Sequence, residues 1–183
     1  MYTETQRQQL KQIAKESIQY GLNHGQPLPV DCNKFDPALR EKRASFVTLK
    51  LNHQLRGCIG RLQAERPLVE DVAENAYSAA FRDPRFAPLS KDEFDTLEYH
   101  ISVLEEPVDL PVQSEAELIE QLVPGKDGVI LSDGIYRGTF LPSVWESLAR
   151  PAEFVHHLKL KAGLPARGWS ESYHVQRYRV EDF

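Results

Sequence analysis

The apolar positions near the start of the chain have the spacing of one helix face: Leu10, Ile13, Ala14 and Ile18. Residues three and four apart lie on the same side of an α-helix, so this pattern predicts an amphipathic helix. Thr5 and Gln8 have the spacing of a capping box that starts a helix, and Gly21 and Gly25 suit its end. The prolines within 26–44 then predict a loop.

Alternating apolar and polar residues predict three strands in the next part of the chain: 46–51, 55–62 and 97–103. Residues 52–54 are polar and turn the chain, so the first two strands are expected to form a hairpin. Pro67 suits the first turn of a helix, and an apolar face continues from there to Ala80. Ser90 and Glu93 have capping-box spacing and predict a short helix before the third strand.

The second half of the chain repeats this order of elements. Ser114 with Glu117 predicts a connecting helix, and Asp133-Gly134 is a strong hairpin turn. The elements expected around and after this turn are two strands, two helices and a last strand: 129–131, 135–141, a helix from 142, 152–163 and 173–180. On the second of these helices, the neighbours of His156 and His157 predict a solvated face that includes Lys159 and Lys161.

Each half is therefore expected to contain a hairpin, two helices and a strand, over about 45–104 and about 128–180. We interpret this order as an internal duplication within a single domain spanning 1–183. The sequence similarity between the two halves is short. Only Arg56-Gly57 and Arg137-Gly138 match, each in the second hairpin strand of its unit. Hairpin-joined strands pair antiparallel, so the predicted class is α+β.

Composition narrows the classes of function. The 183 residues are 41% hydrophobic and 27% charged, which is ordinary for a globular protein and argues against disorder. The net charge of −5 argues against a general nucleic-acid binder. No apolar run resembles a membrane span or a signal peptide, which predicts a cytoplasmic protein with Cys32 and Cys58 as free thiols. No metal-binding motif occurs, and no metal or other cofactor is expected.

The most distinctive stretch of the chain is six residues long: Leu55-Arg56-Gly57-Cys58-Ile59-Gly60. On a regular strand Arg56 and Cys58 share one face, and a cation at that spacing favours a thiolate over a thiol. Gly57 and Gly60 leave the backbone uncovered, so that a ligand can approach closely. The stretch therefore predicts a nucleophilic or redox-active thiol beside a substrate-binding surface.

The same stretch also has a structural explanation. Cysteine is among the most frequently buried residues, and the alternation places Leu55 and Ile59 toward a core. Glycines within a strand often mark a β-bulge. A packed Cys58 in a backbone motif therefore stays open as the alternative.

A second cluster follows the apolar helix: Phe81-Arg82-Asp83-Pro84-Arg85-Phe86. An Asp before a Pro is typical of a turn. In one interpretation this is a structural corner in which Asp83 pairs with Arg82 or Arg85. In the other, Asp83 and Arg85 contribute to a substrate site, with Arg85 binding an anion. The arginines of 56–85 are interspersed with acidic residues, so they do not predict a nucleic-acid surface.

His100 is the candidate general base. It shares its predicted strand face with Glu98 and Ser102, and a neighbouring carboxylate can orient an imidazole. A single histidine on a polar strand face is also typical of a solvent-exposed side chain. The sequence alone does not place this face beside Cys58.

The stretch from Leu55 to Gly60 resembles the signature of the AMME syndrome chromosomal-region (AMMECR) family, whose bacterial and archaeal members are called AmmeMemoRadiSam system protein A. Further blocks resemble other motifs of this family: Asp83-Pro84-Arg85-Phe86 with Pro88-Leu89, Ile101-Ser102-Val103-Leu104, Leu141-Pro142-Ser143-Val144, Lys161-Ala162-Gly163-Leu164 and Trp169. The resemblance extends from about residue 10 to residue 183.

The resemblance implies a duplicated α+β fold with a curved, barrel-like, mainly antiparallel sheet and flanking helices, and a cleft at the six-residue stretch. It implies pathway partners, namely a Memo-like protein and a radical S-adenosylmethionine protein, but no settled reaction. Two cysteines are too few to hold an iron–sulfur cluster unaided. Ser143 and Lys159 depart from the family pattern, in which many members carry Gln and Cys. A dithiol mechanism that uses the second of these positions is therefore not expected here.

Two functions remain open at this stage. The first is an enzyme, or enzyme subunit, in which Cys58 acts on a small-molecule substrate. In it Arg56 lowers the pKa of the thiol or binds an anionic group of the substrate, Arg85 orients the substrate, and His100 accepts a proton. The second is a non-catalytic adaptor or ligand-binding module that presents the Leu55–Gly60 strand to a partner.

Overall fold

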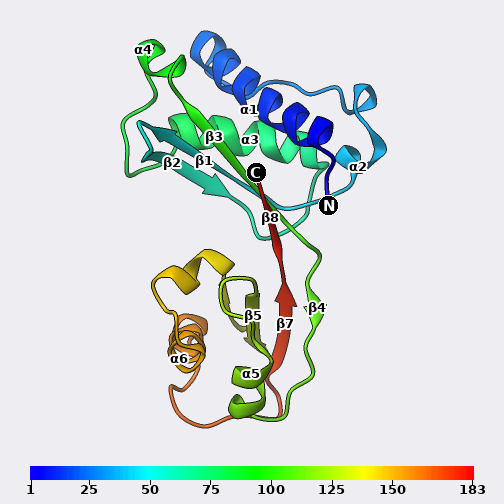
Figure 1. Cartoon of the computed structure of the whole chain (residues 1–183), viewed down its shortest axis with the longest axis vertical. Helices are drawn as coiled ribbons and strands as arrows, with labels where there is room; N and C mark the ends of the chain where they lie inside the picture. The colour runs from blue at the N-terminus through cyan, green and yellow to red at the C-terminus, as the bar shows by residue number, and fades with distance from the viewer. The chain divides into compact units, whose positions relative to one another are not determined.

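The computed structural model describes residues 1–183 and divides them into two compact units (Figure 1). Unit 1 consists of Met1–Leu104 and Glu181–Phe183, and unit 2 consists of Glu105–Val180. Each unit contains a four-stranded sheet with its own hydrophobic core.

Unit 1 has its sheet strands in the order β2-β1-β3-β8. Its elements are α1 (Glu4–His24), η1 (Cys32–Lys34), α2 (Pro37–Arg40), β1 (Ser45–Leu51), β2 (Gln54–Gly60), α3 (Leu68–Phe81), α4 (Lys91–Phe94), β3 (Glu98–Leu104) and β8 (Val180–Asp182). Strand β1 pairs antiparallel with both β2 and β3. The backbone of Phe183, just after β8, exchanges two hydrogen bonds with Ile101 of β3.

Helix α1 begins two residues earlier than the sequence pattern predicts. Its N-cap is Thr3, whose side chain accepts from the Gln6 backbone while the Gln6 side chain accepts from the Thr3 backbone. The prediction of Thr5 as the cap is therefore wrong. Gly25 ends the helix in the left-handed conformation, as its place in the sequence indicates.

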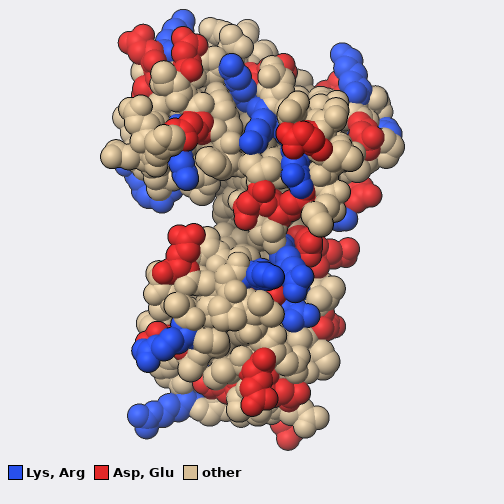
Figure 2. All heavy atoms as spheres, in the orientation of Figure 1, with Lys and Arg blue, Asp and Glu red and all other residues tan.

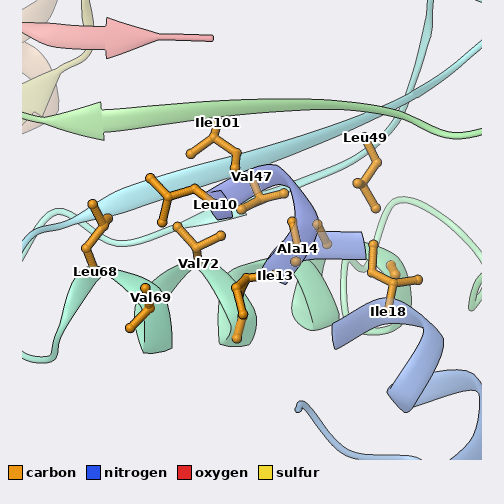
Figure 3. Close-up of a cluster of buried hydrophobic side chains, with 14 of the residues drawn as sticks. Leu10, Ile13, Ala14, Ile18, Val47, Leu49, Leu68, Val69, Val72 and Ile101 are labelled. Atoms are coloured by element: carbon orange, nitrogen blue, oxygen red, sulfur yellow. The ribbon is translucent and has the colours of Figure 1, made fainter. Parts of the chain in front are cut away.

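Helices α1 and α3 pack together on one face of the sheet (Figure 3). The core between these helices and the sheet is aliphatic, with side chains from four elements: Leu10 and Ala14 of α1, Val72 of α3, Val47 and Leu49 of β1, and Ile101 of β3. Because side chains alternate along a strand, the neighbours Thr48 of β1 and His100 of β3 point to the opposite face. This face carries the candidate chemistry.

Unit 2 has its sheet strands in the order β4-β7-β5-β6. Its elements are β4 (Val108–Asp109), α5 (Glu115–Gln121), β5 (Gly128–Asp133), β6 (Tyr136–Phe140), η2 (Pro142–Glu146), α6 (Pro151–Ala162) and β7 (His174–Tyr178). Helix α6 packs on β5 and β6. The aromatic centre of this core is Trp145 stacked on Phe154, with ring centroids 3.8 Å apart. The helix expected after Pro142 is a short 3-10 helix.

The predicted α+β class is confirmed: both units combine helices with antiparallel sheets. The sheets are open, because the order of strands in each ends in two edge strands. No helix has the length and apolar character needed to cross a bilayer. Figure 2 shows acidic and basic side chains interspersed on the visible face of both units.

Candidate functional site

The β1–β2 hairpin contains a bulge that decides how the Leu55–Gly60 stretch is presented. A two-residue turn at Asn52 and His53, both with positive φ, joins the strands. Lys50 pairs with Leu55, but Leu49 pairs with Gly57, so Arg56 is the extra residue of the bulge. The alternation of side chains is interrupted there. Leu55 is 44% exposed, and its prediction as a core residue is wrong for this reason.

Beyond the bulge, one row of side chains crosses three strands on the face of the sheet opposite the helices. Cys58 of β2 pairs with Thr48 of β1, and Thr48 pairs with His100 of β3. The Thr48 Oγ1 and Cys58 Sγ atoms lie 3.1 Å apart, within hydrogen-bond distance. The Cys58 thiol is free and half-buried. The structure thus brings His100 to the same face as Cys58, one strand beyond Thr48.

Asp83 and Arg85 bind the backbone of Cys58 from outside the sheet. The Cys58 N–H donates to Asp83 Oδ2 at 2.9 Å, and Arg85 Nη2 donates to the Cys58 carbonyl at 3.3 Å. Strand β2 is the edge of its sheet, so these side chains satisfy backbone groups that would otherwise be open. We call this arrangement the Asp83–Arg85 clamp.

The clamp is held together by an ion pair. Arg85 donates to both carboxylate oxygens of Asp83, at 3.0 Å from Nε and 2.7 Å from Nη2. These hydrogen bonds, first of all those from Arg85, hold the pKa of the buried Asp83 carboxyl well below its usual range. The Arg85 side chain is 54% exposed. Of the two structural pairings weighed from the sequence, Asp83 pairs with Arg85, while Arg82 pairs with Glu74.

Arg56 is engaged away from the thiol. Its Nε donates to Glu93 Oε1 at 2.6 Å, and its Nη2 donates to Glu93 Oε2 and to the Ala87 carbonyl. The Arg56 hydrogen bond lowers the pKa of Glu93 to about 2. Arg56 Nη1 is buried without a hydrogen-bond partner. The guanidinium charge is therefore compensated by Glu93, and the bulge directs the Arg56 side chain toward α4.

The two glycines of the stretch are approached by the protein itself. A Cβ at Gly57 would lie 2.1 Å from the Ala79 carbonyl oxygen of α3. A Cβ at Gly60 would lie 2.2 Å from the ring of Phe46. Gly57 therefore allows a helix to pack closely on β2, and Gly60 makes room for an aromatic ring.

The surroundings of His100 differ from the expectation that Glu98 orients it. The Glu98 carboxylate is bound by His53, through its backbone N–H and its ring Nδ1, each at 3.0 Å. Desolvation, with Lys50 and Lys11, lowers the pKa of His100. An exposed imidazole with a lowered pKa is neutral at pH 7 and can accept a proton.

The second cysteine has a different environment. Cys32 Sγ donates to Glu70 Oε1 at 3.0 Å. Burial and this carboxylate raise the pKa of Cys32 to about 11, so it stays a thiol at neutral pH. No cluster of three or more His, Cys, Asp or Glu side chains is placed to hold a metal ion.

Two residues next to the candidate site were missed from the sequence. The alternation of apolar and polar residues predicts the correct strand face for Thr48. A regular two-residue hairpin, however, would pair Thr48 with Gly57. The bulge shifts the register by one residue and pairs Thr48 with Cys58. Glu93 was recognised as a capping residue, and it does accept from the Ser90 backbone. Its second role, the pairing with Arg56, has no local sequence signal because 37 positions separate the partners.

Comparisons with known proteins agree with this architecture. The AMMECR1 family model matches residues 11–183. The chain is 37% identical to Protein MJ0810 of Methanocaldococcus jannaschii over 157 residues, which cover 81% of this chain and 76% of that protein. A protein of Aquifex aeolicus is 41% identical over 149 residues, covering 75% of this chain and 74% of its own.

A solved structure shares the fold. The crystal structure of uncharacterized protein PH0010 from Pyrococcus horikoshii superposes with a TM-score of 0.82 at 32% identity. The match covers 98% of this chain and 91% of that one.

Proposed function

The chain belongs to the AMMECR1 family, and on that premise we propose that it is an enzyme or enzyme subunit whose nucleophile is the Cys58 thiol. The observation that carries the proposal is the row of Cys58, Thr48 and His100 across three strands. In this proposal the substrate is a small molecule with an electrophilic centre. The Cys58 sulfur adds to that centre, and the thiol proton passes by way of the Thr48 hydroxyl, 3.1 Å from the sulfur, to the imidazole of His100 on the next strand.

Thr48 and Arg85 have supporting roles in the proposal. The Thr48 hydroxyl holds the Cys58 sulfur at 3.1 Å and lies between the thiol and the His100 strand. Arg85 is exposed, and its Nη1 makes no hydrogen bond within the protein, while Nε and Nη2 bind Asp83 and the Cys58 carbonyl. An anionic group of a substrate can therefore bind Arg85 without dismantling the clamp.

Labelling of Cys58 tests the proposal. Folded Cys32→Ser protein is treated with iodoacetamide at pH 7, and the rate is compared with that of N-acetylcysteine. We expect Cys58 to react faster, and His100→Asn to slow it several-fold. His174→Asn is the matched control, because it makes the same change at an exposed histidine of unit 2. If Cys58 reacted only after denaturant is added, it could not be the nucleophile of the folded protein.

The second candidate function is a non-catalytic adaptor or ligand-binding module. It is favoured by the clamp, which holds β2 firmly and occupies the outward backbone groups of Cys58. A partner at this strand would therefore contact side chains, such as the exposed Leu55. In this case Cys58 stays unreactive, while Leu55→Ser reduces partner binding.

The pathway partners implied by the family form part of both candidates. We infer that the partners are a Memo-like protein and a radical S-adenosylmethionine protein. Size-exclusion chromatography of the purified proteins, alone and mixed, tests for a complex. A shift lost in Leu55→Ser but kept in Cys58→Ser favours the adaptor, and turnover lost in Cys58→Ser favours the enzyme.

A further inference from the structure

Strand β6 of unit 2 leaves its outer edge unpaired. It lies at the end of the sheet order, beyond β5. The hairpin closes on the pair Asp133 and Tyr136, and hydrogen-bonded pairs alternate with open pairs along an antiparallel ladder. The N–H and C=O groups of Arg137 and Thr139 therefore point away from β5. None of the protein's hydrogen bonds reaches these backbone groups.

Exposed apolar side chains accompany this edge. Ile135 at the hairpin tip is 93% exposed, and Tyr136 of β6 is 51% exposed. Tyr136 lies beside the C-terminal end of α6, since a Cβ at Gly163 would lie 3.1 Å from its ring. An extended edge with exposed apolar residues is a template for pairing with another chain.

Two cations without a carboxylate partner lie near β6, on opposite faces of the sheet. Arg137 belongs to β6 itself and lies on the face away from α6. The Lys161 ammonium lies 5.0 Å from the ring centroid of Phe140 of β6, on the face of α6. The ion pairs of unit 2 involve neither residue. Both side chains are exposed. The edge is therefore complementary to negative charge.

Unit 1 shows which chemistry satisfies such an edge. There the corresponding edge strand is β2, and the Asp83 carboxylate accepts from the Cys58 N–H while Arg85 donates to its carbonyl. Cys58 follows Arg56-Gly57 as Thr139 follows Arg137-Gly138. Unit 2 has no side chain that does this at Thr139.

We propose that β6 is a docking edge for an extended acidic segment of a partner protein, which adds to the sheet as a fifth strand. Its backbone pairs with Arg137 and Thr139. Its acidic side chains lie on the face of Arg137, and its apolar side chains, which alternate with them, cover Tyr136 on the face of α6. A second copy of this chain is a poorer occupant, because it would bring the Arg137 side chains of both copies to one edge. The proposal does not depend on any reaction at Cys58.

Amide NMR of the full chain with a defined probe tests this. The probe is a blocked synthetic peptide in which Glu and Val alternate, and a peptide in which Lys replaces Glu is the charge control. With the acidic peptide we expect slower hydrogen exchange at the Arg137 and Thr139 amides, which are open in the free protein. The amides of Cys58 and its neighbours should not change.

Variants separate backbone pairing from charge. Thr139→Pro removes an outward N–H without removing a β5–β6 hydrogen bond, and should abolish the protection, whereas Thr139→Ala should keep it. Arg137→Glu should weaken acidic-peptide binding about fivefold. Lys126→Glu makes the same charge change at an exposed lysine outside β6 and should leave binding unchanged.

Three results would overturn the proposal. The first is equal protection by the acidic and basic peptides. The second is unchanged exchange at Arg137 and Thr139 with millimolar acidic peptide. The third is protection that grows with protein concentration alone, together with a dimer in sedimentation, because the occupant would then be a second copy.

Discussion

The two units share a strand order but differ in the row of side chains that crosses it. Unit 1 runs β2-β1-β3 and unit 2 runs β6-β5-β7. Gly57 pairs with Leu49 in the first, and Gly138 pairs with Leu131 in the second. The adjoining row is Cys58, Thr48 and His100 in unit 1, and Thr139, Ile130 and Gln176 in unit 2. Only unit 1 combines a thiol and an imidazole on this framework, so the framework itself does not require them.

The edge strands differ as well. In unit 1 a bulge at Arg56 and the Asp83–Arg85 clamp modify and cover β2. In unit 2 the hairpin is regular and β6 has no clamp. In β2 the bulge and the clamp occupy the outward backbone groups of Cys58 and leave side chains exposed at the edge. In β6 the outward backbone N–H and C=O groups stay open to pair with another strand. Internal duplication within one domain of two repeat-like lobes stays a prediction that this likeness supports.

The largest effect is expected at the two matched glycines. An added Cβ would lie 2.1 Å from a backbone oxygen of α3 at Gly57, and 2.7 Å from a backbone nitrogen of α6 at Gly138. Gly57→Ala should destabilise unit 1 by about 3 kcal/mol or more, and Gly138→Ala should destabilise unit 2 by about 2 kcal/mol.

Two measurements show which unit loses stability in each variant. Both tryptophans, Trp145 and Trp169, belong to unit 2, so their fluorescence in urea follows that unit. Amide exchange of β1 follows unit 1. If Gly57→Ala were tolerated as well as Gly138→Ala, the close helix approach would not distinguish the units.

An effect of comparable size, within unit 2, is expected at Lys159. Although predicted on a solvated helix face, it is fully buried, with Nζ 2.6 Å from Glu115 Oε2 and 2.7 Å from the Gly168 carbonyl. That prediction is wrong because a long-range carboxylate and a loop carbonyl bind the ammonium. Lys159→Ala should cost about 3 kcal/mol, since it leaves a cavity and an unpaired carboxylate.

Lys161→Ala is the matched control for this change, because Lys161 is exposed two positions along α6. It should change stability by less than about 0.5 kcal/mol in urea unfolding followed by tryptophan fluorescence. The labelling rate of Cys58 should be the same in both variants below the unfolding transition. A changed rate in Lys159→Ala would show that the chemistry of unit 1 depends on unit 2.

The smallest effect concerns pH and the Arg56–Glu93 pair. Glu93 has a pKa of about 2 in the folded protein and about 4.3 in an unfolded chain. The pair therefore stabilises the protein fully above about pH 4.3, and this stabilisation is lost as pH falls toward about 2. After allowance for solvent screening at a partly exposed carboxylate, the contribution is about 1 kcal/mol.

Glu93→Gln should accordingly lower stability at pH 6 and change it little near pH 2. Urea unfolding at the two pH values measures this difference in stability. Amide exchange in β2 measures it at intermediate pH values. An equal loss at both pH values would mean that Glu93 acts through packing or capping and not through its charge. Unit 2 should show no corresponding change in tryptophan fluorescence.

Much of the local structure could be predicted from short-range patterns. The helix face around Leu10, the hairpin turn at Asp133-Gly134 and the Ser114 cap depend on neighbours within a few positions, and all are present. The candidate residues themselves were also identified, because unusual residues such as Cys58 and His100 stand out in a strand pattern. Their mutual arrangement could not be predicted in the same way.

The sequence by itself determined the elements, the α+β class and the family, since these depend on local periodicity, caps, turns and matched motifs. Only the tertiary structure decided that Cys58 lies opposite Thr48 and in one row with His100, because a single bulge shifts the strand register. It also decided that Arg56 is bound by Glu93 and that Lys159 is buried. These pairings form between residues dozens of positions apart, where the energy of a buried charge depends on partners that no local pattern specifies.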